Sequence, residues 1–411
     1  MPLFSHPALH ACLRKAGLVG LIAVLAGTAG AFFLWSLEAV TALRLAHPWL
    51  LWLLPGLGFG VSWLYLMTGG RAERGTGLIL DEIHEPGGGV PARMAPLIVL
   101  GTLATHLGGG SVGREGTAVQ MGGSLAAAVA GFFKCAHREQ PGLLMAGVAA
   151  GFGAVFGTPW AGAVFALEVL RRRQGMLREW PWCLAAAVLA DRVCHGWGGH
   201  HAVWLVSGDF PMADFRIWLK AAVAAVIFGL TARWFVDLMH GFGGWIKRRI
   251  PYAPLRPVIG GLGVIALVQL SGTRAYLGLG TTAAEPGGLV LASFFGDQPV
   301  DPWAWAWKLG FTLISLGFGF KGGEVTPLFF IGAALGHSLG NLLGGPAGVF
   351  AALGLVAVFG AAARAPAACF LMGVELFGPA LALPMALACG IASLCGGRGL
   401  YHPVPRLQPA A

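Results

Sequence analysis

Two short glycine-rich segments of this sequence each place a glutamate directly before an apolar run. Residues 113–123 read GREGTAVQMGG, and residues 322–332 read GGEVTPLFFIG. The free N–H groups and partial positive charge at a helix N-terminus bind anions directly. The carboxylate of Glu115 can take the place of such an anion, and once protonated it no longer needs that place. We therefore expect Glu115 to be both a competing anion and a proton carrier. Glu324 is expected to be a second proton group or, alternatively, a helix-start carboxylate stabilised by the helix dipole.

The two segments belong to an internal repeat. Both fit the pattern Gly-x-Glu-x-Thr-x5-Gly, at an offset of 209 residues. A second pair of segments, PWAGAVFALE at 159–168 and PAACFLMGVE at 366–375, recurs at an offset of 207 residues. Two motifs at nearly one offset predict two homologous halves, about 1–205 and 206–411, within a single transmembrane domain. In transporters built from two repeats, the substrate site lies near the midplane, where broken helices meet.

Other polar groups of these motifs have plainer explanations. Glu168 and Glu375 end the second pair of segments, and we expect them to be structural caps or members of interfacial ion pairs. Thr117 and Thr326 stand near helix starts, where N-terminal capping explains both. For Thr326, a hydroxyl that faces the anion is an equal alternative.

An enzyme is the rival interpretation from another class. It would use Glu115 and Glu324 as an acid pair, or Ser338 as a nucleophile, because GHSLG at 336–340 matches the pattern GxSxG. That pattern needs a strand-to-helix elbow, whereas this one lies inside an unbroken apolar run. No metal ligands join the acids, so we expect no enzyme activity.

Composition places the chain in a membrane. Hydrophobic residues make up 56%, charged residues 11%, and the mean hydropathy is +0.72. About 20 apolar residues span a bilayer. Ala16–Leu37 and Pro48–Gly70 carry no charge, and Val325–Ala363 is long enough for two passes. We expect roughly ten to fourteen membrane helices or half-helices, packed closely through many of the 66 glycines.

The net charge is +9, and the basic residues lie in clusters at the ends of apolar blocks. This distribution is typical of membrane topology and not of nucleic-acid binding. Basic clusters lie at 71–74, 171–173 and 247–249. The positive-inside rule predicts that these three loops are cytoplasmic. Arg14 and Lys15 precede the first apolar run, which predicts a cytoplasmic N-terminus.

Cysteine and histidine spacing predicts no disulfide framework, metal site or cofactor. The seven cysteines show no CxxC pair and fit small buried hydrophobic residues. The twelve histidines show no metal-ligand spacing. His200 and His201 lie in the loop 196–212, which has no Lys or Arg. We place this loop on the far side and expect both histidines to be solvated. No removed signal peptide is predicted.

Together these motifs resemble the CLC family of chloride channels and proton-coupled antiporters, over about residues 60 to 401. GREGT (113–117) is similar to the family's Gly-Lys/Arg-Glu-Gly-Pro loop, with Thr117 in place of the proline. GGEVTP (322–327) stands where chloride-type members carry Gly-Gly-Ile-Phe-Ala-Pro. Segments 157–168 and 363–375 are similar to family helices, and GGRGLY (396–401) falls where the family carries its pore tyrosine.

Departures from the chloride type point to one branch. GTGLI (75–79) replaces Gly-Ser-Gly-Ile-Pro, so that Thr76 stands for the central serine. Val169 stands where chloride-type antiporters place a second proton glutamate. Glu324 and Thr326 in the second motif resemble the fluoride-exporting branch, CLC-F, although that branch often has methionine at the position of Thr76.

The resemblance implies an all-α polytopic membrane protein with a CLC-type two-fold inverted repeat and discontinuous helices. It implies a homodimer in the lipid bilayer, with one pore per subunit and no cytoplasmic regulatory domain. The implied function is proton-coupled fluoride export across the inner membrane, which confers fluoride resistance; a chloride/proton antiporter or a passive chloride channel is the alternative. The implied anion-binding residues are Thr76, Gly77, Gly113, Arg114, Gly116, Thr117, Val325, Thr326 and Tyr401.

Overall fold

The computed structural model describes residues 6–169, 176–201, 204–285, 287–296 and 298–401. These residues form helices joined by turns, which confirms the predicted all-α class. The helices of the first half are α1 (His6–Ala46), α2 (Leu54–Thr68), α3 (Thr76–His84), α4 (Met94–Leu107), α5 (Glu115–Phe132), α6 (Gln140–Phe156), α7 (Pro159–Glu168) and α8 (Trp180–Gly196). Those of the second half are α9 (Phe215–Arg249), α10 (Leu255–Ser271), α11 (Ala304–Gly317), α12 (Val325–Leu343), α13 (Ala347–Ala363), α14 (Pro366–Phe377) and α15 (Ala382–Cys395). Short 3-10 segments are Pro48–Leu53, Gly70–Arg74, Met176–Glu179, Leu291–Phe295 and Pro379–Leu381.

Helix lengths vary widely. Four candidate spans are long and apolar enough to cross a membrane: Leu9–Ala46, Pro48–Thr68, Phe215–Arg249 and Val325–Leu343. The other apolar helices in the described residues have only 10–17 residues. The apolar run Val325–Ala363 does divide into two helices, at a left-handed turn on Gly344 (φ 63°). Short helices that end inside the molecule leave helix termini there, where an anion can meet them.

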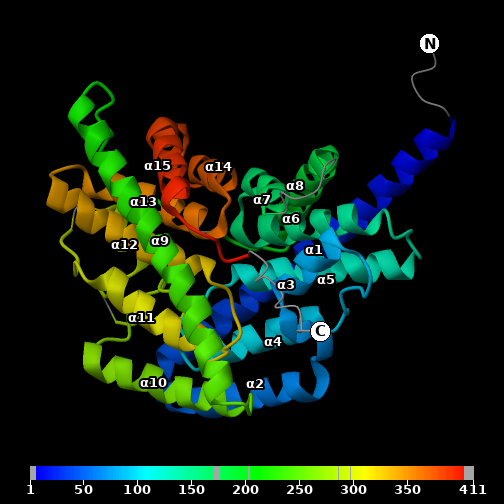
Figure 1. The fold of residues 1–411 in the computed structure, drawn as a ribbon, viewed down its shortest axis with the longest axis horizontal. Helices are drawn as coiled ribbons and strands as arrows, with labels where there is room; N and C mark the ends of the chain where they lie inside the picture. The colour runs from blue at the N-terminus through cyan, green and yellow to red at the C-terminus, as the bar shows by residue number, and fades with distance from the viewer. Residues whose placement is uncertain (1–5, 170–175, 202–203, 286, 297, 402–411) are drawn as a thin grey trace, which may run out of the picture.

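Two closely packed helix pairs lie at the centre of the molecule, and the other helices surround them. In Figure 1, α9 runs obliquely across the molecule, and α2 and α10 lie side by side along the lower edge. Helix pairs α5–α6 and α12–α13 form the tightly packed centre, and all of α13 is buried. Glycines permit this packing: a Cβ on Gly122 would lie 2.1 Å from the Gly147 oxygen, and one on Gly332 would lie 2.3 Å from the Gly354 oxygen.

Glu168 in the first half caps a helix of the second half, and Glu375 in the second half caps a helix of the first. The Glu168 carboxylate accepts hydrogen bonds from the N–H groups of Ala367 (3.1 Å) and Ala368 (2.8 Å), at the start of α14. The Glu375 carboxylate accepts from Trp160 (3.0 Å) and Ala161 (2.9 Å), at the start of α7. Both are the structural caps that the sequence predicted. This reciprocal pattern is what a two-fold relation between the halves would produce, and it supports the proposed division.

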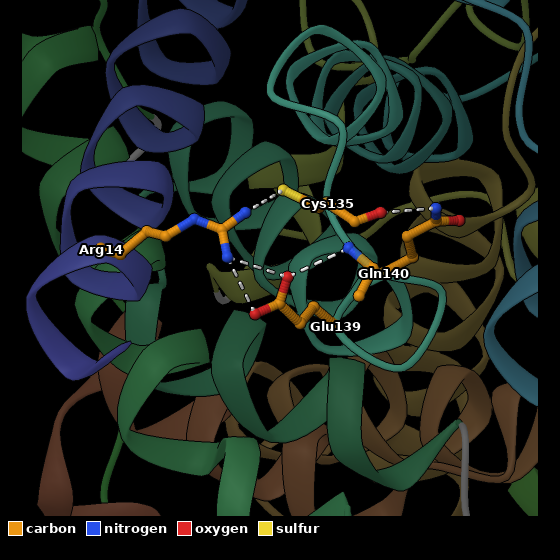
Figure 2. A network of polar contacts seen from close by, with 5 residues as sticks. Arg14, Cys135, Glu139 and Gln140 are labelled. Atoms are coloured by element: carbon orange, nitrogen blue, oxygen red, sulfur yellow. Dashed lines mark hydrogen bonds and ion pairs between the residues drawn. The ribbon is translucent and has the colours of Figure 1, made fainter. Parts of the chain in front are cut away.

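The amino-terminal end of α1 is tied to the turn between α5 and α6 (Figure 2). The Arg14 guanidinium donates to the Glu139 carboxylate at 3.3 Å and lies 3.7 Å from Cys135 Sγ. The side chains of this ion pair are 50% and 39% exposed, so the pair adds little to stability. The pair links α1 to the residue that precedes α6.

Candidate functional site

The two glycine-rich loops cross at the centre of the molecule. The N–H of Gly113 donates to the Gly323 oxygen at 2.5 Å, and the N–H of Gly323 donates to the Gly113 oxygen at 2.8 Å. A Cβ on Gly323 would lie 2.5 Å from the Gly116 nitrogen. Backbones this close require glycine at the crossing. The crossing brings the starts of α5 and α12 together from opposite halves of the chain.

Glu115 lies at this meeting point as the first residue of α5, and its side chain is buried. Its Oε2 accepts hydrogen bonds from the backbone N–H of Arg114 (3.0 Å) and of Thr326 (3.0 Å). Its Oε1 accepts from the Thr326 hydroxyl, and the Arg114 Nε lies 3.9 Å away. One carboxylate therefore occupies donors at the starts of two helices, which is a site suited to an anion.

Two cavities with different linings reach the loop crossing, and we call them the outer vestibule and the inner cavity. The outer vestibule, of about 500 Å³, is lined by Arg114, Glu115 and Thr326. The inner cavity, of about 1010 Å³, is lined by Gly116 and Glu324. Basic side chains also line the inner cavity: Arg71, Arg74, Lys247, Arg256 and Lys321. The helix starts at the loop crossing therefore separate two spaces that an anion can enter.

Glu324 lies on the inner side of the crossing. It is the residue before α12, but its side chain makes no capping bond to that helix, and it is half-buried in the inner cavity. Glu115 instead lines the outer vestibule and is bonded to α12. The motif-related glutamates thus line different cavities.

The predicted anion-binding residues divide between the helix starts and the inner cavity. Gly113, Arg114 and Thr326 surround the Glu115 carboxylate, and Val325 is buried as the first residue of α12. Thr76, the first residue of α3, and Gly77 line the inner cavity.

Among the described residues, neither Thr117 nor Tyr401 is hydrogen-bonded to the Glu115 carboxylate. The Thr117 hydroxyl is buried and shares a 2.6 Å hydrogen bond with the Thr102 hydroxyl of α4, so its contact is structural. Tyr401 lines the inner cavity together with Thr76 and packs its ring edgewise on Phe165, at 6.0 Å between centroids.

Sequence reasoning missed two residues of these cavities. Gln120 of α5 is buried, lines the inner cavity and donates to the Thr76 hydroxyl at 3.4 Å. Arg44 of α1 lines the outer vestibule, and its buried Nε has no hydrogen-bond partner in the described residues. A polar side chain inside an otherwise apolar segment was the available signal for both.

Ser338 lies within a helix and not at a strand-to-helix elbow. It lies inside α12, where its hydroxyl donates to the carbonyl oxygens of Ala334 (3.0 Å) and Pro302 (3.2 Å). A serine hydroxyl inside a helix commonly bonds to a backbone carbonyl oxygen in this way.

Comparisons with known proteins agree with this architecture. Residues 57–397 match the family model described as voltage gated chloride channel. The chain is 46% identical over 397 residues to a chloride/fluoride channel protein of Pseudomonas syringae pv. tomato, covering 94% of this chain and 85% of that protein. It is 28% identical over 435 residues to the H(+)/Cl(-) exchange transporter ClcA of Cronobacter sakazakii, covering 94% and 88%. The crystal structure of a CLC-type fluoride/proton antiporter superposes with a TM-score of 0.90, at 33% identity over 97% of this chain and 98% of that one.

Proposed function

This chain belongs to the CLC family of voltage-gated chloride channels and related transporters, and from that premise we propose that it exchanges fluoride for protons across a membrane. The observation that carries the proposal is the Glu115 carboxylate, held by N–H groups at the starts of α5 and α12. An ionised side chain in this place competes with a substrate anion. Its protonation removes the charge that the helix starts stabilise, so the anion can replace it.

Once the Glu115 carboxylate has moved away, fluoride would bind to the hydrogen-bond donors that the carboxylate had occupied. The backbone N–H groups of Arg114 and Thr326 already converge on one oxygen atom, and the Thr326 hydroxyl is adjacent. Charge-assisted hydrogen bonds to an anion are short and strong. Because fluoride is small and tightly hydrated, it needs such close donors to replace its water.

Protons would reach Glu115 from the inner cavity through Glu324. Val169 lines this cavity without an acidic group, whereas Glu324 lines it with a carboxyl next to the loop crossing. The route assigns Glu324 to the inner side and Glu115 to the outer side.

Two of the similar proteins carry fluoride in their descriptions, which supports fluoride as the substrate. One relative is described as a chloride/fluoride channel protein, and one superposed structure as a fluoride/proton antiporter. Val169, Glu324 and Thr326 are among the residues of this chain that depart from the chloride type. Chloride/proton antiport and a passive chloride channel are the alternatives within the same fold, and enzyme chemistry is not proposed.

The proposal includes a location and an assembly. We propose an inner-membrane homodimer with a cytoplasmic N-terminus, in which export through each subunit confers fluoride resistance. Basic residues 71, 74 and 247 line the inner cavity, and by the positive-inside rule we place this cavity on the cytoplasmic side. Residues 171–173 lie outside the described residues. Single cysteines at 71 and 247, in a cysteine-free background, should react with an impermeant reagent only from that side, and labelling from outside would reverse the assignment.

Ion efflux from proteoliposomes tests the substrate directly. Fluoride and chloride release are recorded with anion-specific electrodes from vesicles loaded with each salt. Fluoride efflux is expected to be far faster than chloride efflux. Equal rates would move the protein to the chloride-transporting alternatives.

A further inference from the structure

A separate cluster of polar side chains lies where the loop after α8 returns over the end of that helix. Asp191 and His195 are one helical turn apart near the end of α8, and His201 comes from the loop. The three potential ligand atoms all lie within 4.8 Å of one another. The His201 side chain is only 9% exposed, so the prediction that it is solvated is wrong, while His200 is exposed as predicted.

The hydrogen bonds of His201 leave a lone pair facing a carboxylate. Its Nε2 lies 2.9 Å from the Ala154 oxygen, and a carbonyl oxygen can only accept, so Nε2 carries the proton of a neutral ring. Its Nδ1 lies 4.0 Å from Asp191 Oδ1. Both atoms are buried without a hydrogen-bond partner in the described residues. Two buried acceptors that face each other are unfavourable unless a metal ion or a proton binds between them.

We infer that Asp191, His195 and His201 form a binding site for a divalent transition-metal ion of the zinc class. Imidazole nitrogen and carboxylate oxygen are ligands that zinc takes, with water in an open position. The His201–Ala154 bond is the outer-shell contact that usually fixes a ligating imidazole. Ca²⁺ and Mg²⁺ prefer oxygen ligands only, so two histidines disfavour them.

The separations of the ligand atoms fit this assignment. Asp191 Oδ1 lies 3.5 Å from His195 Nδ1 and 4.0 Å from His201 Nδ1. Metal–ligand bonds of about 2.0–2.1 Å bring tetrahedral ligand atoms to about 3.4 Å from one another. The His195 side chain is 55% exposed, and its ring lies beside that of His201, with the two centroids 5.0 Å apart. Small side-chain movements therefore complete the site.

Gly157 leaves room for the His201 ring because it has no side chain. Gly157 ends α6 in a left-handed conformation (φ 71°), and a Cβ there would lie 2.5 Å from the His201 ring. His200, His201 and Trp204 also line the outer vestibule onto which Glu115 opens. A bound metal ion would join α8 to this wall of the vestibule.

Equilibrium dialysis of the tag-free, full-length protein in detergent tests the site. The protein is equilibrated with zinc chloride against a metal buffer, and bound zinc is counted by mass spectrometry. One zinc ion per chain is expected for the wild type and for the His200→Ala control. The variants His201→Ala and His195→Ala should lose it; His195 is exposed, so its replacement leaves the fold intact. Bound Co²⁺ should show the visible absorption of a tetrahedral N/O site, and His195→Ala should abolish it.

Two results would overturn the assignment. Wild-type protein that retains no zinc would identify the cluster as an ordinary ion pair between Asp191 and a protonated His201. Equal zinc in the wild type and in both histidine variants would place the metal elsewhere on the chain.

Discussion

The two glycine loops share a motif but hold their glutamates in opposite ways. In the loop at 113–117, the Glu115 carboxylate is buried and accepts hydrogen bonds from both helix starts. In the loop at 322–326, Glu324 makes no side-chain cap and opens into the inner cavity. The backbones of the two loops are equivalent at the crossing, because the N–H groups of Gly113 and Gly323 each donate to the carbonyl oxygen of the other. We propose that this difference gives one repeated element two roles, an anion competitor at Glu115 and a proton entry point at Glu324.

Removing the charge of Glu115 should have the largest effect. Glu115→Gln keeps the side-chain size but holds the residue permanently uncharged, so no proton can be exchanged there. Proton flux coupled to fluoride should fall to that of protein-free liposomes, as recorded with a pH electrode during fluoride efflux. A variant in which a proton gradient still drives full anion movement would remove Glu115 from the mechanism.

Glu324→Gln should separate binding from exchange. The inner proton entry is lost while the donors of Arg114 and Thr326 remain, so we expect fluoride binding by calorimetry but lost or greatly slowed exchange. Normal proton flux in this variant would instead leave water, or direct access to Glu115, as the proton route. The asymmetry of the two loops would then be structural only.

The loop crossing itself can be broken with one methyl group. Gly323→Ala places a Cβ 2.5 Å from the Gly116 nitrogen, and overpacking of this kind typically costs about 1–3 kcal/mol. Gly310→Ala is the matched control, because nothing lies within 4 Å of its Cβ position. Thermal unfolding in detergent should show a lower midpoint for Gly323→Ala than for the control. Equal unfolding midpoints for Gly323→Ala and Gly310→Ala would mean that the two loops are not in close contact.

Two threonines at equivalent motif positions should respond differently to loss of the hydroxyl. Thr326→Val removes a donor to a charged group, worth about 1.5 kcal/mol, or roughly tenfold in fluoride affinity. Thr117→Val breaks only the bond to Thr102, so it should lower stability and not affinity. Calorimetric titration of both variants with fluoride decides this, and an equal loss of affinity would restore Thr117 to the anion site.

The reciprocal caps should give the smallest effects. Glu168→Gln and Glu375→Gln each remove one charge from a helix start, worth about 0.3–1 kcal/mol. Because the two caps are equivalent in geometry, similar small decreases in unfolding temperature are expected, with coupled transport retained. A loss of coupling in only one of them would show that this pair is as asymmetric as the glutamates of the loops.

Local patterns predicted much of this molecule. Glycine loops before apolar runs placed the starts of α5 and α12, and recurring offsets identified Glu168 and Glu375 as related groups. Sequence could not show that Glu115 bonds to Thr326, because that contact joins residues 211 apart. It also missed His201 beside Asp191, since a loop residue and a helix residue meet there with no regular spacing. Gln120 was overlooked because its importance arises only from the cavity that it lines.

Uphill fluoride movement driven by protons tests the central claim most directly. Proteoliposomes hold equal fluoride inside and outside, the membrane potential is clamped at zero, and the outside is acidified. Proton entry through an antiporter should drive fluoride out of the vesicles, so external fluoride rises, and Glu115→Gln should abolish the rise. Passive diffusion of HF would carry fluoride inward, so the sign of the flow separates the two processes. No outward fluoride movement from wild-type vesicles would contradict proton-coupled exchange.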